Sequence, residues 1–190
     1  MNLSCTNRGK PSIAGDYATS DDFRKLFTED MEGLHLLAYL LTGDQEKAEQ
    51  CFVAGFEDSV NNNHIFKEWA HSWAQRTIVQ SAIRMMAPRP EHAACARVSP
   101  DRDARLQSAP GEHPAIATVL ALEDFERFVF VLSVLERYSD QDCSILLSCS
   151  REDVRAARIR ALQQISEIDH KNGKSEDDSI ISLQAVSQGR

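Results

Sequence analysis

Five of the six prolines in this 190-residue chain fall between residues 87 and 114, and they constrain the fold more than any other feature. They are Pro88, Pro90, Pro100, Pro110 and Pro114. Proline lacks the backbone N–H that helices and sheets use, so a stretch with this many prolines interrupts both. We therefore predict a linker over residues 87–114 that joins two modules, residues 21–86 and residues 115–169. A disordered N-terminus (1–20) and a polar tail (170–190) complete the predicted division.

The first module has the periodicity of a helical bundle, because its apolar residues recur at three- and four-residue steps and never alternate as in a strand. Asp21 and Asp22 open the first helix by supplying an N-cap and negative charge. Gly43 suits the C-cap of the second helix, and Asp44 suits the N-cap of the third. A final helix is predicted over residues 65–86.

The second module contains a short helix, a tight turn and a longer helix in succession. Ser139 is the expected N-cap of a helix over residues 140–146. After a turn at residues 147–150, a further helix is predicted over residues 151–168, with Ser150 as its N-cap. This order is typical of a helix-turn-helix. We expect an all-α protein.

The last predicted helix gathers arginines on one side. At about 100° per residue, Arg151, Arg155 and Arg158 fall within about 60° of one another. The neighbouring stripe, which can face the core, consists of Val154, Ala157, Ala161 and Ile165. A guanidinium can hold a phosphate or the edge of guanine with two hydrogen bonds, so this row is a candidate DNA contact.

The overall charge opposes that interpretation. The chain has a formal net charge of −8 and a pI near 5.2, and duplex DNA repels an acidic body. Any DNA contact must therefore be a local basic patch. The alternative is a solvated amphipathic helix whose arginines pair with Glu152, Asp153 and Glu167.

Nothing in the sequence points to catalysis, a metal or a membrane span. The five cysteines form no CxxC pair, and the six histidines form no HExxH motif. We expect Cys51, Cys143 and Cys149 to be small buried hydrophobic residues. No run approaches the roughly 18 apolar residues of a membrane span, and residues 1–19 lack the apolar core of a secretory signal. We expect a cytoplasmic protein that is not an enzyme and has no cofactor.

Two sets of residues carry a resemblance to a known family. In the first module they are Leu37 to Asp44, Ala48-Glu49, Phe56, Phe66, Trp69, Ala74 and Arg84. In the second module they are Tyr138-Ser139, Ser150, Val154-Arg155 and Arg160-Ala161-Leu162. In order and spacing, these residues resemble regions two and four of the sigma-70 family, in particular its small extracytoplasmic-function members. The linker lacks a region three, as in that subtype.

The resemblance implies a chain that binds core RNA polymerase and directs it to promoter DNA, with an anti-sigma factor as a further candidate partner. The DNA contacts that it implies are Arg76 and Arg84 in the first module, and Arg151, Arg155, Arg158 and Arg160 in the second. The implied partner contacts are Glu49, Gln50, Val53 and Phe56.

The contact surfaces depart from the family pattern more than the scaffold does. In the polymerase-binding helix, Gln50, Val53 and Ala54 stand where the family usually has Asp, Gln and Glu. In the promoter-melting helix, Arg76 and Gln80 replace the usual Asn and Asp. The usual glycine of the turn is a serine, Ser148.

These departures leave two further hypotheses open. One is a sigma-like regulatory protein that binds an anti-sigma factor or another protein without initiating transcription, through an apolar surface formed by Cys51, Phe52, Val53 and Phe56. The other is a conventional helix-turn-helix repressor that uses only the second module. Trp69 and Trp73, four residues apart, suit either base stacking or core packing, and we expect core packing, especially for Trp69.

Overall fold

The computed structural model describes residues 17–61, 64–90 and 114–168. Within these ranges the chain forms helices and turns without a strand, and an isolated bridge joins Tyr17 to Phe66. The all-α prediction is confirmed. Most of the predicted linker, the first sixteen residues and the tail from residue 169 lie outside the described residues.

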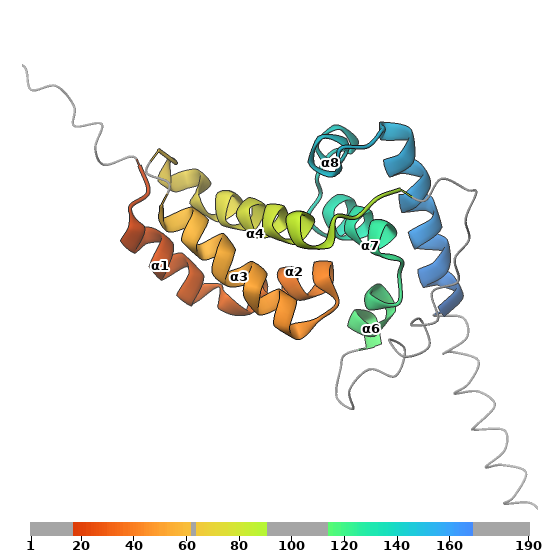
Figure 1. Cartoon of the computed structure of the whole chain (residues 1–190), viewed down its shortest axis with the longest axis horizontal. Coiled ribbons are helices and arrows are strands. Elements are labelled where there is room, and N and C mark those ends of the chain that lie inside the picture. Colours follow the sequence, from red (N-terminus) through yellow and green to blue (C-terminus); the bar gives the residue numbers. More distant parts are fainter. Residues whose placement is uncertain (1–16, 62–63, 91–113, 169–190) are drawn as a thin grey trace, which may run out of the picture.

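The first segment of the chain is a bundle of four α-helices (Figure 1). They are α1 (Ser20–Glu29), α2 (Met31–Thr42), α3 (Gln45–Val60) and α4 (Ala70–Met86), and a 3₁₀ turn, η2 (Lys67–Trp69), precedes α4. Helix α3 packs against the other three helices, and α2 also packs against α4. The single predicted helix over residues 65–86 is thus a 3₁₀ turn followed by α4.

The helix ends follow short-range signals. Thr19 is the N-cap of α1, because its side chain accepts a hydrogen bond from the Asp22 N–H at 3.2 Å. The Asp22 carboxylate accepts the Thr19 N–H at 2.8 Å, which completes a capping box. The predicted N-cap at Asp21 and Asp22 is therefore wrong by two to three residues. The predicted caps at Gly43, with φ +66°, and at Asp44 are confirmed.

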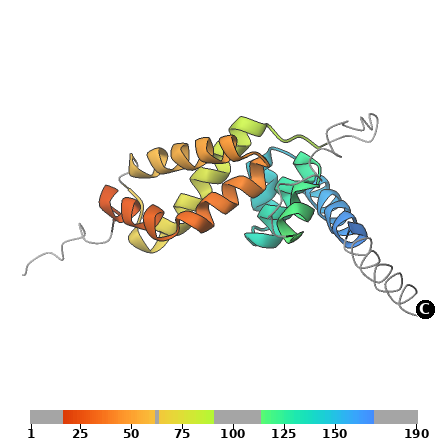
Figure 2. The same cartoon turned by 90° about the horizontal axis from the view of Figure 1, so that it is seen from below.

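The second segment consists of shorter helices and a final long one. Helices α6 (Pro114–Leu120) and α7 (Asp124–Phe130) come first, and α7 continues into a π-helical turn, η3 (Val131–Leu135). Helix α8 (Asp140–Leu147) and the helix over residues 151–168 follow. Figure 2 shows this last helix, in blue, at the opposite end of the molecule from α1.

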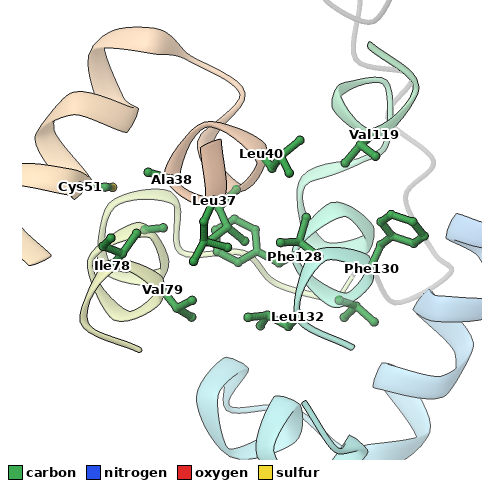
Figure 3. Close-up of a cluster of buried hydrophobic side chains, with 14 of the residues drawn as sticks. Leu37, Ala38, Leu40, Cys51, Ile78, Val79, Val119, Phe128, Phe130 and Leu132 are labelled. Carbon is green, nitrogen blue, oxygen red and sulfur yellow. The ribbon is translucent and has the colours of Figure 1, made fainter. Parts of the chain in front are cut away.

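One hydrophobic cluster runs through both segments (Figure 3). Leu37 of α2, Val79 of α4 and Phe128 of α7 meet in it, and all three are buried. Cys51 and Cys143 are also buried in this cluster, as predicted, whereas Cys149 is half-buried at its edge. The two segments therefore pack against each other through a shared core.

A buried arginine joins α7 to the C-terminus of α2. The Arg127 side chain is 1% exposed. Its Nε and Nη2 each donate to the Leu41 carbonyl at 3.3 Å, and Nη2 donates to the Thr42 carbonyl at 3.4 Å. Its Nη1 donates to the Leu122 carbonyl at 3.3 Å, and Nη2 pairs with Asp124 at 2.8 Å. The last carbonyls of a helix lack hydrogen-bond donors within the helix and carry the negative end of its dipole. The Arg127 guanidinium supplies both the missing donors and a positive charge at the end of α2.

Replacing Arg127 with methionine should lower the free energy of unfolding by about 3 kcal/mol, because buried carbonyls of both segments would lose their donors. Urea unfolding measures the change. In the matched control Asp124→Asn, the loss should stay below about 1 kcal/mol, because Asp124 is 40% exposed and remains hydrated. Equal stability of Arg127→Met and the parent protein would contradict a role for Arg127 in joining the segments.

Candidate nucleic-acid interface

The turn between α8 and the helix over residues 151–168 has the geometry that the sequence predicts. Ser139 caps α8 by accepting the Asp142 N–H at 3.1 Å. Ser148 reverses the chain with φ +52°, in the left-handed region where glycine is the usual residue. Ser150 accepts the Asp153 N–H at 3.0 Å, and the Asp153 carboxylate accepts the Ser150 N–H at 3.2 Å. The predicted caps at Ser139 and Ser150 are confirmed.

A buried stripe sets the rotation of the last helix. Val154, Ala157 and Ala161 are fully buried in the shared core, and Ile165 packs against it half-buried. The predicted stripe is confirmed. Because these side chains face inward, Arg151 and Arg155 are left on the exposed side.

Two arginines of the predicted row converge on one carboxylate of the preceding helix. Arg155 Nε lies 3.0 Å from Asp140 Oδ2, and Arg158 Nη1 lies 2.6 Å from Asp140 Oδ1. Hydrogen bonds from Arg158 and then Arg155 lower the pKa of Asp140 below its ordinary value. The row is thus paired across the turn with the first residue of α8. The predicted pairing with carboxylates of the same helix is not what the structure shows for these two arginines.

Arg160 has a different partner and faces another direction. Its Nε lies 2.5 Å from Oε1 of the buried Glu126 of α7, and Gln164 Nε2 donates to Oε2 of the same carboxylate at 3.0 Å. At about 100° per residue, Arg160 lies on the opposite side of the helix from Arg151. Glu126 therefore anchors the last helix to α7 through Arg160.

The arginines of α4 are also apart from the predicted row. Arg84 Nη2 lies 2.9 Å from Asp58 of α3 and donates to Ser81 at 3.0 Å. Arg76 is half-buried and lines a cleft. Within the described ranges, Arg76 and Arg151 make neither a hydrogen bond nor an ion pair. Of the predicted DNA contacts, Arg151, Arg155 and Arg158 share one side of the last helix, and only Arg155 and Arg158 share a partner.

The charges around the start of the last helix are balanced. The arginines are Arg151, Arg155 and Arg158, and the carboxylates are Asp140, Glu152 and Asp153. Three positive and three negative charges leave this patch without a formal net charge. Non-specific affinity for duplex DNA comes from local excess positive charge, which this patch lacks.

Two apolar side chains stand beside the arginines on the exposed face. Ile159 is 57% exposed and Leu162 is 46% exposed. At about 100° per residue, each lies within about 40° of Arg155 around the helix. A protein that covers them removes apolar surface from water, and arginine is enriched among interface residues. Ile159 was not predicted to be exposed, although its position around the helix, away from the buried stripe, indicates that it is.

The partner contacts predicted on α3 divide between surface and core. Glu49 and Gln50 are exposed, and Val53 is 52% exposed. Phe56 is half-buried, and its ring lies edge-on to Phe27 with the centroids 5.2 Å apart. Phe56 therefore takes part in packing α1 against α3.

The predicted apolar docking surface on α3 is wrong in most of its members. Cys51 is buried in the core, and Phe52 is half-buried with its ring edge-on to Phe27 at 5.3 Å. Of the four residues named for that surface, only Val53 is mainly exposed.

The expectation that Trp69 packs in the core is also wrong. Trp69 is 58% exposed, because it ends the η2 turn before α4 begins and so does not continue the buried face of that helix. Trp73 is half-buried against a small cluster that includes Phe23. The Trp73 Nε1–H is buried and has no acceptor among the described residues.

Searches for known relatives add no family assignment. No protein-family model matches the chain, and no curated protein matches it. In the ranges that the structure covers, no cluster of His, Cys, Asp or Glu could hold a metal ion. No described helix is both long enough and apolar enough to cross a membrane.

Replacing Asp140 with asparagine should cost about 1 kcal/mol of unfolding free energy at neutral pH, since two partly exposed ion pairs are lost. A carboxylate with a lowered pKa stabilises the fold above its ordinary pKa of 3.8, and this contribution disappears as the pH falls through the lowered value. The difference between Asp140→Asn and the parent protein should therefore shrink below pH 3.8. Urea unfolding at a series of pH values measures it.

Glu167→Gln is the control for that series, because Glu167 is exposed and makes no ion pair within the described residues. It should match the parent protein at every pH. A constant difference between Asp140→Asn and the parent protein across the series would show that the ion pairs are not its cause.

Proposed function

We propose that this chain is a sigma-like regulatory protein that binds a protein partner of the anti-sigma class and does not direct RNA polymerase to promoters. The observation that carries the proposal is the exposed face of the last helix. Arg155 and Arg158 on it share the Asp140 carboxylate, while Ile159 and Leu162 stand open to solvent.

A polyanion and a protein partner gain different amounts of free energy at this face. A polyanion gains little, because Asp140, Glu152 and Asp153 together offset the positive charges of Arg151, Arg155 and Arg158. A protein that covers Ile159 and Leu162 gains about 25 cal/mol for each Å² of apolar surface that it buries. The face therefore favours a protein partner over duplex DNA.

The shared core supports the same proposal. A factor that reads two separate promoter elements needs its two helical segments at a distance from each other. Here Arg127 and Phe128 tie the second segment to α2, so the two segments are held together. A sigma-like chain in this compact state is suited to binding a protein that recognises sigma factors.

The first test is binding to anti-sigma factors of the same organism, measured by titration calorimetry. Ile159→Asp and Leu162→Asp should each weaken binding by about 2 kcal/mol or more, because each places a charge in a desolvated contact. Met31→Asp changes an equally exposed residue on α2 and should leave binding unchanged. Promoter-dependent transcripts formed by core RNA polymerase with this chain would overturn the proposal.

A second candidate function is promoter-directed initiation with core RNA polymerase, as the family resemblance implies. The specific observation that favours it is the intact helix-turn-helix geometry, with both caps and the left-handed turn at Ser148. The ion pairs to Asp140 are partly exposed and worth about 1 kcal/mol or less each, so a phosphate could compete for the arginines.

A substitution series on duplex promoter DNA separates the two functions. If the last helix reads DNA, Arg155→Ala should cost about 1–3 kcal/mol, and Arg151→Ala should lower the salt slope by about one. Asp140→Asn should then tighten binding, because the patch gains a net positive charge. Fluorescence anisotropy at several salt concentrations measures all three variants. Our first proposal expects no binding by the parent protein or by either arginine variant.

A further inference from the structure

A cleft of about 540 Å³ lies between the start of α4 and the loop that leads into α8. One wall comes from the first segment and includes Trp69, Trp73 and Arg76, and the other comes from the second segment and includes Arg137 and Tyr138. This volume falls within the range of small-molecule sites in proteins. The cleft exists only because the two segments are packed together.

Two arginines and two carboxylates line the cleft, and the hydrogen-bond donors of the arginine side chains are open among the described residues. Each carboxylate accepts one hydrogen bond from a neutral side chain, Glu136 from Gln75 at 3.0 Å and Asp142 from Ser139 at 2.6 Å. In the part of the chain that the structure describes, the guanidiniums of Arg76 and Arg137 have no such partner. A ligand that enters the cleft therefore meets two guanidiniums that make no hydrogen bond or ion pair with the described residues, beside two carboxylates.

Two further features of the walls favour an aromatic ligand. Trp69 and Tyr138 offer ring surface that the core does not cover completely, and Trp73 has the buried indole N–H without an acceptor. A flat ring can stack on such side chains, and guanidinium groups pair with carboxylates in fixed geometry. Arg137 has φ +58°, in the left-handed region that often follows the last residue of a helix, and η3 ends just before it.

We propose that this cleft binds a small planar aromatic carboxylate, with its ring against Trp69 and its carboxylate held by Arg76 and Arg137. A ligand in this position touches both segments, so binding also stabilises their packed arrangement. The site is independent of the protein partner proposed above, because the exposed face of the last helix contributes nothing to it.

The chain supplies its own reporter for this site, because its only two tryptophans, Trp69 and Trp73, both line the cleft. We expect 4-nitrobenzoate to quench tryptophan fluorescence with saturation at one molecule per chain. The uncharged analogue 4-nitrobenzamide has nearly the same shape and should bind roughly tenfold more weakly or worse, since it lacks the charge that the guanidiniums recognise.

Two variants test the named cations. Arg76→Gln and Arg137→Gln should each weaken 4-nitrobenzoate roughly tenfold and change the affinity for 4-nitrobenzamide little. Arg137 is exposed, so its variant should fold even if Arg76→Gln does not. Arg151→Gln, an exposed arginine outside the cleft, is the matched control and should bind as the parent protein does.

Three results would overturn the proposal. They are quenching that rises linearly without saturation, equal affinity for the acid and the amide, and unchanged 4-nitrobenzoate affinity in Arg137→Gln. None of these results depends on whether the chain binds an anti-sigma factor or DNA.

Discussion

The arrangement of the whole chain depends on the burial of one positive charge. Removing a guanidinium from water is costly unless its donors find acceptors, and Arg127 finds them in both halves of the chain. The carbonyls of Leu41 and Thr42 belong to α2, whereas that of Leu122 precedes α7. Arg127 is satisfied only when the second segment is docked on the first, so the two segments are coupled by electrostatics as well as by apolar contact.

Helix α7 transmits this coupling to the last helix. Glu126 and Arg127 are neighbours in sequence and point about 100° apart around α7. The first holds Arg160 and Gln164, and the second holds the end of α2. A helix of seven residues therefore sets where the helix-turn-helix lies relative to the N-terminal bundle.

The sequence predicted most of what short-range chemistry decides, although the N-cap of α1 is Thr19 and not Asp21 or Asp22. The caps at Gly43, Asp44, Ser139 and Ser150 were correct, because each depends on groups within about three or four residues. The all-α fold and the buried stripe of the last helix were predicted from the spacing of apolar residues. The arginine partners did not follow, because Asp140 and Glu126 approach from other helices and no local pattern specifies such a distant carboxylate. The burial of Trp69 was predicted wrongly because an unbroken helix was assumed there. Trp69 lies in a 3₁₀ turn, which points its side chain in another direction than an α-helix would.

The π-helical turn at the end of α7 sets the direction of the residues that follow it. In η3 the Glu136 N–H bonds to the Val131 carbonyl, five residues back, at 2.9 Å. Such a turn holds one residue more than an α-helical turn, and it is removed by deleting that residue. The deletion would leave a regular helix but swing Glu136 and Arg137 by about 100°, away from α4. The extra residue of η3 thus decides whether Glu136 and Arg137 face α4.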